Sequence, residues 1–99
     1  MTITPEVLNK FKERMHISHN EDDNLKSLLS SSVIAIKKSC GPFEISGNTD
    51  IDIQARELVF ERTRYAYNDA LEYFKENFLS EITSLGLAIE MERMKDAGL

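Results

Sequence analysis

Apolar residues recur at helical spacing along most of the chain, separated by short polar connectors. The first such segment runs from Pro5 to about Met15, and its narrow apolar stripe contains Val7, Leu8, Phe11 and Met15. Thr4 can cap this segment, Pro5 suits a first helical position, and Glu6 complements the helix dipole. The pattern therefore predicts a short helix over residues 5–15.

A second helix is predicted after the polar connector 16–20. Ser18 and Glu21 have the spacing of a capping box, and acidic residues 21–23 fill the first turn that follows. One face of this helix is apolar and contains Leu25, Leu28, Leu29, Val33, Ile36 and Cys40. Gly41 and Pro42 end the helix, so 41–50 is predicted to be an irregular loop, with Thr49 or Asp50 capping the next helix.

The segment from Ile51 to Tyr67 predicts a long central helix around which the others are arranged. At about 100° per residue, it carries two apolar stripes on opposite faces. The larger stripe contains Ile51, Ala55, Leu58, Val59, Tyr65 and Ala66, and the smaller one contains Ile53, Phe60 and Tyr67. Such a helix must be covered on both sides. Either its own domain covers both stripes, or the smaller stripe is a subunit interface formed by Ile53, Phe60 and Tyr67.

Arg62 falls in the middle of the larger apolar stripe, where a charge is unexpected. Its aliphatic stem can pack while its guanidinium reaches solvent. Alternatively it forms a buried or interfacial ion pair, because a desolvated guanidinium without a carboxylate is very costly. Under the second interpretation, Arg62 joins the candidate subunit-interface residues.

Beyond Tyr67 the sequence allows two arrangements. Asp69 and Glu72 have capping-box spacing, which favours a bend near Asn68 and a new helix. Yet later apolar residues keep the phase of the smaller stripe, as one continuous helix would require: Leu71, Phe74, Phe78, Ile82, Leu85 and Ile89. We favour the bend, because a helix of such length is rare in a small domain. The expected fold is a single all-α domain over residues 1–99, a small bundle of about four helices.

The end of the chain carries a separate apolar strip formed by Leu87, Met91 and Met94. Gly86 precedes it and weakens the helix there by about 1 kcal/mol relative to alanine. Residues 87–99 are therefore either a frayed helix end or a flexible tail that docks on a partner. Methionines suit the second role because they adapt to the surface that they meet.

Composition narrows the classes of function. The net charge of −5 argues against binding nucleic acid through phosphate neutralisation. A single cysteine, Cys40, excludes an internal disulfide and fits a reducing compartment. The charged residues near the N-terminus give no sign of a signal peptide, and no apolar run is long enough to span a membrane.

The residues that could take part in catalysis or metal binding form no recognisable active site. His16 and His19 lie near the acidic residues 21–23 and are candidate metal ligands, but there is no second histidine pair and the acidic run suits a helix start. Cys40 on an apolar stripe indicates a structural thiol. We find no phosphate-binding glycine loop and no nucleophile motif. The sequence predicts no enzyme, no cofactor and no metal.

Two stretches resemble the small head–tail connector proteins of long-tailed bacteriophages, also called adaptor, head-completion or DNA-packaging proteins. The stretches are 58–69, LVFERTRYAYND, and 78–82, FLSEI. A short first helix, acidic residues 21–23 before Leu25, Leu28 and Leu29, and a glycine followed by an irregular loop also fit. The resemblance covers nearly the whole chain, although the loop 41–50 is short and the tail after Leu87 departs from many relatives.

This resemblance implies a helical subunit, made in the host cytoplasm, that forms a ring, commonly a dodecamer in the virion, at the head–tail interface. The ring lies under the portal protein, extends the DNA channel without binding DNA specifically, and docks the next tail-side component. The resemblance also implies that Leu87, Met91 and Met94 contact the portal. The alternative is a small helical regulatory module that binds one protein through its second apolar face.

Overall fold

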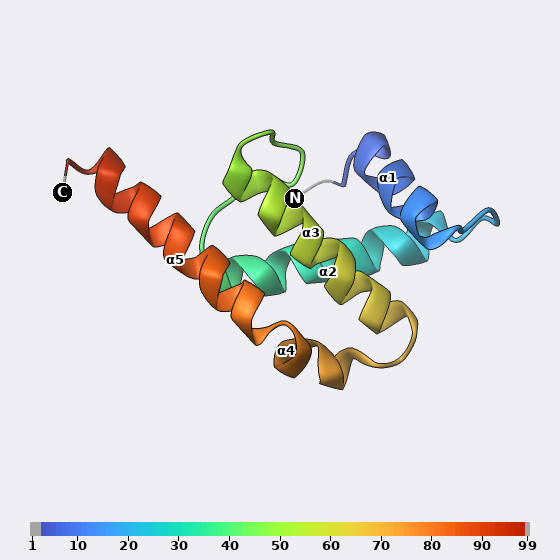
Figure 1. Cartoon of the computed structure of the whole chain (residues 1–99). Helices are drawn as coiled ribbons and strands as arrows, with labels where there is room; N and C mark the ends of the chain where they lie inside the picture. Colours follow the sequence, from blue (N-terminus) through green and yellow to red (C-terminus); the bar gives the residue numbers. More distant parts are fainter. Residues whose placement is uncertain (1–2, 99) are drawn as a thin grey trace.

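Helices and their connectors account for all of the described residues, 3–98, in the computed structural model (Figure 1). The elements are α1 (Pro5–Met15), α2 (Asp22–Cys40), α3 (Asp50–Tyr67), the short 3-10 helix η1 (Leu71–Tyr73), α4 (Phe74–Asn77) and α5 (Leu79–Asp96). No strand occurs within 3–98. The predicted all-α class is confirmed. The number of helices is larger than expected, because the segment after Asn68 divides into three pieces.

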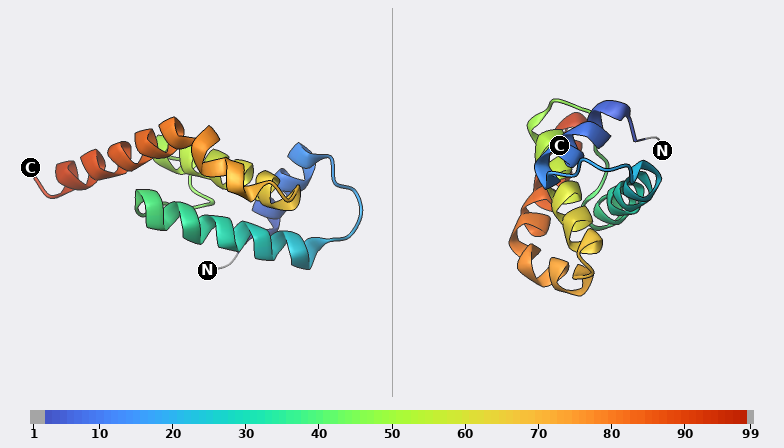
Figure 2. Two further views of the ribbon diagram at one scale, coloured as in Figure 1. Left: turned by 90° about the horizontal axis from the view of Figure 1, so that it is seen from below. Right: turned by 90° about the vertical axis from the view of Figure 1, so that its right-hand side faces the viewer.

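The helix α3 is central by position and not by length. It has 18 residues, as α5 does, and α2 has 19. α3 packs against both α2 and α5, and α1 reaches it through the edge-to-face contact of Phe11 with Phe60 (Figures 1 and 2). The largest apolar side chains that are fully buried are Phe11, Leu25, Leu29, Ile36, Leu85, Val33 and Val59. The core is thus formed where α2, α3 and α5 meet, with α1 closing one side.

Two of the predicted helix caps are confirmed and two are wrong. The side chains of Thr4 and Thr49 accept hydrogen bonds from the backbone N–H groups of Val7 and Asp52. Ser18 does not cap α2, because the Glu21 carboxylate that would complete the capping box contacts His19 and Tyr67 instead. Asp69 does not cap a helix either: it adopts a left-handed conformation with φ 55° in the turn before η1.

The predicted bend near Asn68 is confirmed, and one continuous helix through 51–89 is wrong. The Asn68 side chain donates a hydrogen bond of 3.0 Å to the Arg64 carbonyl, and the Ala70 N–H donates one of 2.8 Å to the Tyr65 carbonyl. These bonds satisfy carbonyls at the end of α3. A second break follows at Phe78, whose φ of −116° is not helical. By contrast, α5 continues through Gly86, which is not a helix end.

Both apolar stripes of α3 are largely covered by the chain itself. Phe60 is only 2% exposed, because Phe11 meets its ring edge-on at a centroid distance of 5.5 Å and the Arg14 guanidinium lies over it. The expectation that the Phe60 side chain lies on a subunit surface is therefore wrong. The sequence could not show that α1 would fold back over the smaller stripe. Ile53, about two turns earlier in α3, is the member of that stripe left exposed.

The loop 41–49 has a fixed conformation because α3 holds it. Asp52 accepts a hydrogen bond of 2.9 Å from the Glu44 N–H, and Arg56 donates to the carbonyls of Ile45 and Gly47 at 3.1 and 2.9 Å. The side chains of Phe43 and Ile45 are buried in the core. The first turn of α3 and the loop therefore form one rigid corner of the molecule.

The C-terminal half of α5 extends beyond the rest of the bundle. Ile89 is its last buried residue, and residues 90–98 are all exposed. In Figure 2 the last turns of α5 lie beyond the end of α2, on the far side of the molecule from α1. This projection makes the molecule elongated, with dimensions of 49 × 28 × 19 Å.

Candidate functional site

The four residues expected at a subunit interface lie in four different environments. Phe60 is in the core, whereas Ile53 is 44% exposed. Ile53 lies in a groove of about 460 Å³ between α1 and α3, whose charged lining includes Lys10, Arg14 and Glu57. Arg14 and Glu57 form an ion pair there. Of the smaller stripe, only the Ile53 end thus presents substantial apolar surface to a partner.

Arg62 is directed against α2. Its Nη1 donates a hydrogen bond of 3.1 Å to Ser32 Oγ, which lies 2.9 Å from the hydroxyl of the buried Thr63. Partial burial lowers the pKa of Arg62 below its ordinary value. None of the ion pairs among residues 3–98 includes Arg62. The expected ion pair is therefore not formed within this part of the chain, and Arg62 acts as a polar link between α2 and α3.

Tyr67 joins the end of α3 to the start of α2. Its hydroxyl donates a hydrogen bond of 2.6 Å to Glu21 Oε2, and His19 contacts the same carboxylate oxygen. The hydrogen bonds from Tyr67 and His19 lower the pKa of Glu21, and the same Glu21 bond raises the pKa of Tyr67. This network fixes the connector 16–21 against α3, so the role of Tyr67 seen here is within the subunit.

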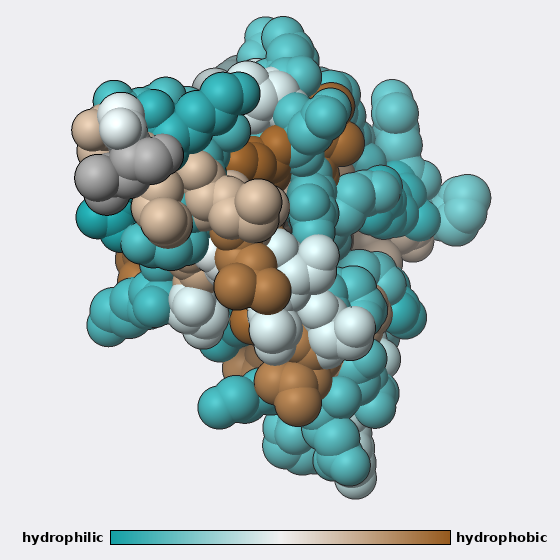
Figure 3. Space-filling model, turned by 60° about the vertical axis from the view of Figure 1, so that its left-hand side comes forward, coloured by the Kyte–Doolittle hydropathy of each residue, from teal (hydrophilic) through white to brown (hydrophobic). Residues whose placement is uncertain are grey.

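An exposed apolar stripe runs along the outer face of α5, opposite the side that enters the core. It begins at Leu79 and continues through Leu87, Met91 and Met94, which are between 46% and 68% exposed. Figure 3 shows this side of the molecule, where apolar surface extends toward the C-terminus among hydrophilic residues. Such clustering differs from apolar residues scattered singly over a surface. The stripe is therefore a candidate contact surface.

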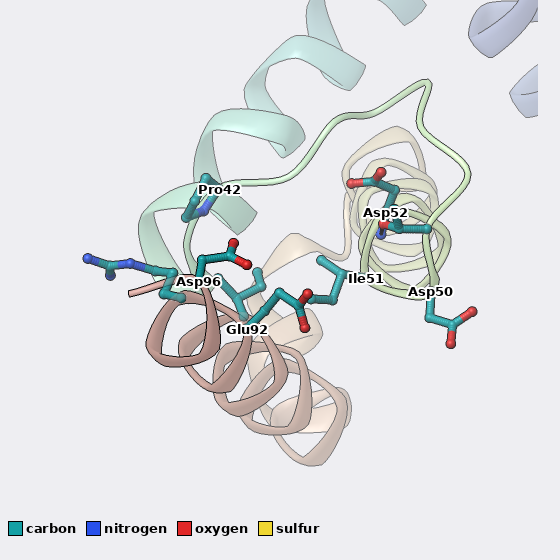
Figure 4. Close-up of a pocket in the computed structure, with 9 residues that line it drawn as sticks. Pro42, Asp50, Ile51, Asp52, Glu92 and Asp96 are labelled. Atoms are coloured by element: carbon teal, nitrogen blue, oxygen red, sulfur yellow. Dashed lines mark hydrogen bonds between the residues drawn. The ribbon is translucent and has the colours of Figure 1, made fainter. Parts of the chain in front are cut away.

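The inner side of the projecting end of α5 faces a cleft of about 460 Å³. Ile51 and Ile89 provide apolar surface, and Figure 4 shows Ile51 of α3 directed toward Glu92 of α5. The charged residues that line the cleft are Asp50, Asp52, Glu92, Arg93 and Asp96. This excess of carboxylates makes the cleft acidic.

The histidines and the cysteine, which could in principle bind a metal or act in catalysis, have structural roles in this fold. His16 ends α1 in a left-handed conformation, and His19 pairs with Glu21. Within 3–98 there is no group of three or more His, Cys, Asp or Glu side chains placed to hold a metal ion. Cys40 is buried, its thiol donates to the Ile82 carbonyl at 3.3 Å, and burial raises its pKa. A raised pKa makes a thiol a poor nucleophile at neutral pH.

Sequence reasoning identified the exposed strip at Leu87, Met91 and Met94 but missed two further features. It did not include Leu79, which the phase of a helix unbroken at Gly86 places on the same face. It also missed the groove beside Ile53, because the position of α1 is not visible in the pattern of α3. Placing residues 79–96 on one continuous helical wheel would have revealed Leu79.

Comparison of the chain with protein-family models, with curated proteins and with solved structures gives no match. None of the described helices combines the length and apolarity needed to cross a bilayer.

Proposed function

We propose that this chain is a structural subunit of a phage head–tail connector, which assembles into a ring between the portal and the next tail-side component. The observation that carries the proposal is the outer stripe of α5, formed by Leu79, Leu87, Met91 and Met94. A small monomer gains nothing from projecting a helix whose apolar face contacts only water, whereas an assembling subunit requires such a face.

The distribution of chemical groups supports a structural role. His16 caps the end of α1, His19 contacts Glu21, and Cys40 and the partly buried Arg62 make contacts between helices. The cleft beside α5 is lined mainly by carboxylates, and the groove between α1 and α3 is lined by charged side chains of both signs. The function is therefore sought in association with other chains.

The charge supports passage of DNA without retention. With a net charge of −5 and an acidic cleft beside α5, the chain lacks the excess of Lys and Arg that phosphate binding requires. A ring with such a surface repels a sliding duplex and does not hold it.

The proposal is tested by the mass of the assembled protein. Purified chain is examined by native mass spectrometry and electron microscopy, alone and after incubation with portal-bearing capsids. We expect rings of many subunits, in solution or on the portal. A chain that remains a monomer under both conditions, or that forms only a 1:1 complex with another protein, would favour a regulatory module instead.

A further inference from the structure

Arg62 differs from the other four arginines of the chain in what its guanidinium binds. Three of the others form ion pairs with glutamates: Arg14, Arg64 and Arg93. The fourth, Arg56, donates hydrogen bonds to two loop carbonyls. Within 3–98, Arg62 donates only to the neutral hydroxyl of Ser32. It is therefore an arginine without a counter-ion in this part of the chain.

One corner of the Arg62 guanidinium is fixed between α2 and α3. Its Nη1 lies 3.1 Å from Ser32 Oγ, and the Ser32 hydroxyl lies 2.9 Å from that of Thr63. The Thr63 hydroxyl donates in turn to the Val59 carbonyl, at 2.8 Å. Because Ser32 and Thr63 are fully buried, this corner is held by the core and cannot turn toward solvent.

The other edge of the guanidinium, formed by Nε and Nη2, is accessible. Among residues 3–98, the only hydrogen bond of Arg62 is made by Nη1. In the same part of the chain, no buried side-chain nitrogen or oxygen lacks a hydrogen-bond partner. The Nε and Nη2 atoms of Arg62 therefore reach the surface, where another molecule can approach them.

Arg64, two positions later, shows what such an edge holds. Its Nε and Nη2 each donate a hydrogen bond of 3.0 Å to the Glu61 carboxylate, one to each oxygen. These bonds raise the pKa of Arg64, whereas partial burial lowers the pKa of Arg62. The two guanidiniums thus differ in that a carboxylate occupies the Nε–Nη2 edge of Arg64 and none within 3–98 occupies that of Arg62.

A partly buried charge without an opposite charge is costly, so an anion at the Nε–Nη2 edge of Arg62 would be favourable. The two coplanar N–H groups match the two oxygens of a carboxylate. A phosphate fits less well, because it carries more negative charge than one arginine balances and the chain already has a net charge of −5.

We propose that the Nε–Nη2 edge of Arg62 binds the carboxylate of an Asp or Glu side chain on a partner protein. This contact is the interfacial ion pair that the position of Arg62 on α3 suggested. It goes beyond the proposed connector function and does not depend on ring formation, since the edge is accessible in the single subunit.

Nitrogen-15 NMR of the arginine side chains tests the site in the wild-type chain. Each arginine gives one Nε–Hε signal, and Arg62→Lys identifies the signal of Arg62 by its loss. If that variant does not fold, through-bond correlation with the backbone assigns the signal. Sodium acetate is titrated at constant ionic strength against sodium chloride. We expect the Arg62 signal to follow a saturating curve, with Hε moving downfield as it donates to acetate.

Three controls define the specificity. Arg64 is the matched control, because its Nε already donates to Glu61 and its signal should shift little. Arg93, exposed near the end of α5, reports the general effect of acetate on an arginine in water and should not saturate. Acetamide has nearly the shape of acetate without its charge and should leave the Arg62 signal unchanged.

Two outcomes would overturn the proposal. An Arg62 shift no larger than that of Arg93 would mean that the Nε–Nη2 edge is only hydrated. A stronger response to methyl phosphate than to acetate would assign the edge to a phosphate ester and reject a carboxylate partner. Both outcomes leave the connector function intact, because that function is tested separately by the mass of the assembled protein.

Discussion

The ring of Phe11 in α1 meets the ring of Phe60 in α3 edge-on, with centroids 5.5 Å apart and planes inclined by 61°. This contact closes the smaller apolar stripe of α3 within the subunit. It also gives Phe60 and Ile53 different environments: Phe60 is buried and Ile53 is exposed, although the two are seven positions apart and look equivalent in the sequence.

Replacing Phe60 with alanine should greatly destabilise the fold. A large-to-small change at a buried phenylalanine costs about 3–5 kcal/mol, which is a large part of the typical stability of a small domain, about 5–15 kcal/mol. Ile53→Ala, at an exposed position of the same stripe, should change stability by no more than about 0.5 kcal/mol. Urea unfolding followed by circular dichroism measures both. Equal effects would mean that α1 does not cover Phe60 in solution.

Gly47→Ala should lower the stability of the fold, and Gly86→Ala should raise it. A Cβ on Gly47 would lie 2.0 Å from the Asp52 carboxylate, so Asp52 must move and lose its bond to Glu44. Overpacking of this kind costs about 1–3 kcal/mol. A Cβ on Gly86 meets only the Cys40 Cα, at 3.8 Å, and alanine should stabilise α5 by about 1 kcal/mol. Thermal unfolding of the two variants should therefore shift in opposite directions.

The Asp52 carboxylate should make stability depend on pH in the acidic range. Burial raises its pKa, but hydrogen bonds from the Glu44 N–H and from Thr49, with the nearby Arg56 charge, outweigh this and leave the pKa below its ordinary value. The stabilisation is therefore complete above the unfolded pKa of about 3.9 and is lost as the pH falls through the lower folded value.

We expect Asp52→Asn to be less stable than the wild type at pH 6 and to lose less stability between about pH 4 and pH 2. Asp50→Asn, at an exposed neighbouring position, is the matched control and should keep the wild-type profile. Urea midpoints over this range provide the measurement. Parallel profiles for wild type and Asp52→Asn would show that another group causes the acid sensitivity.

Truncation should show that the independent end of the chain begins after Ile89 and not after Gly86. Residues 90–98 are exposed, so removal of 90–99 should leave the thermal midpoint nearly unchanged. Removal of 87–99 also takes away Ile89, which is 3% exposed and packs on Gly41, and should cost about 2–5 kcal/mol. Differential scanning calorimetry separates the two. A large effect of the shorter truncation would mean that the projecting turns stabilise the fold.

The helical segments were predictable because their apolar spacing is regular, and Thr4, Thr49 and Asn68 marked ends that the structure shares. The predictions that failed concerned contacts between residues that are far apart in the sequence. Ser18 and Glu21 have capping-box spacing, but the Glu21 carboxylate accepts a hydrogen bond from Tyr67 instead. Tyr67 lies 46 positions later in the chain. In the same way, the cover over Phe60 comes from α1, and local periodicity carries no information about a helix packed from elsewhere in the chain.

For the candidate surfaces too, features set by local periodicity were predictable and features set by contacts between distant segments were not. The strip at Leu87, Met91 and Met94 was found because exposure follows from its phase on α5. The groove around Ile53 depends on how two helices of different sequence position meet, and so it appears only in three dimensions. Arg62 was recognised as unusual, yet its link to Ser32 is a tertiary contact that composition could not supply.

The projecting end of α5 also divides the helix into two zones of amide hydrogen exchange. Amides up to Ile89 belong to a segment whose inner face is anchored in the core, so they open only with larger unfolding events. Beyond it, the hydrogen bonds of the last turns are surrounded by water, and their amides should exchange rapidly in a free subunit. Protection that appears beyond Ile89 as the subunit concentration rises would then record assembly residue by residue, without any label on the chain.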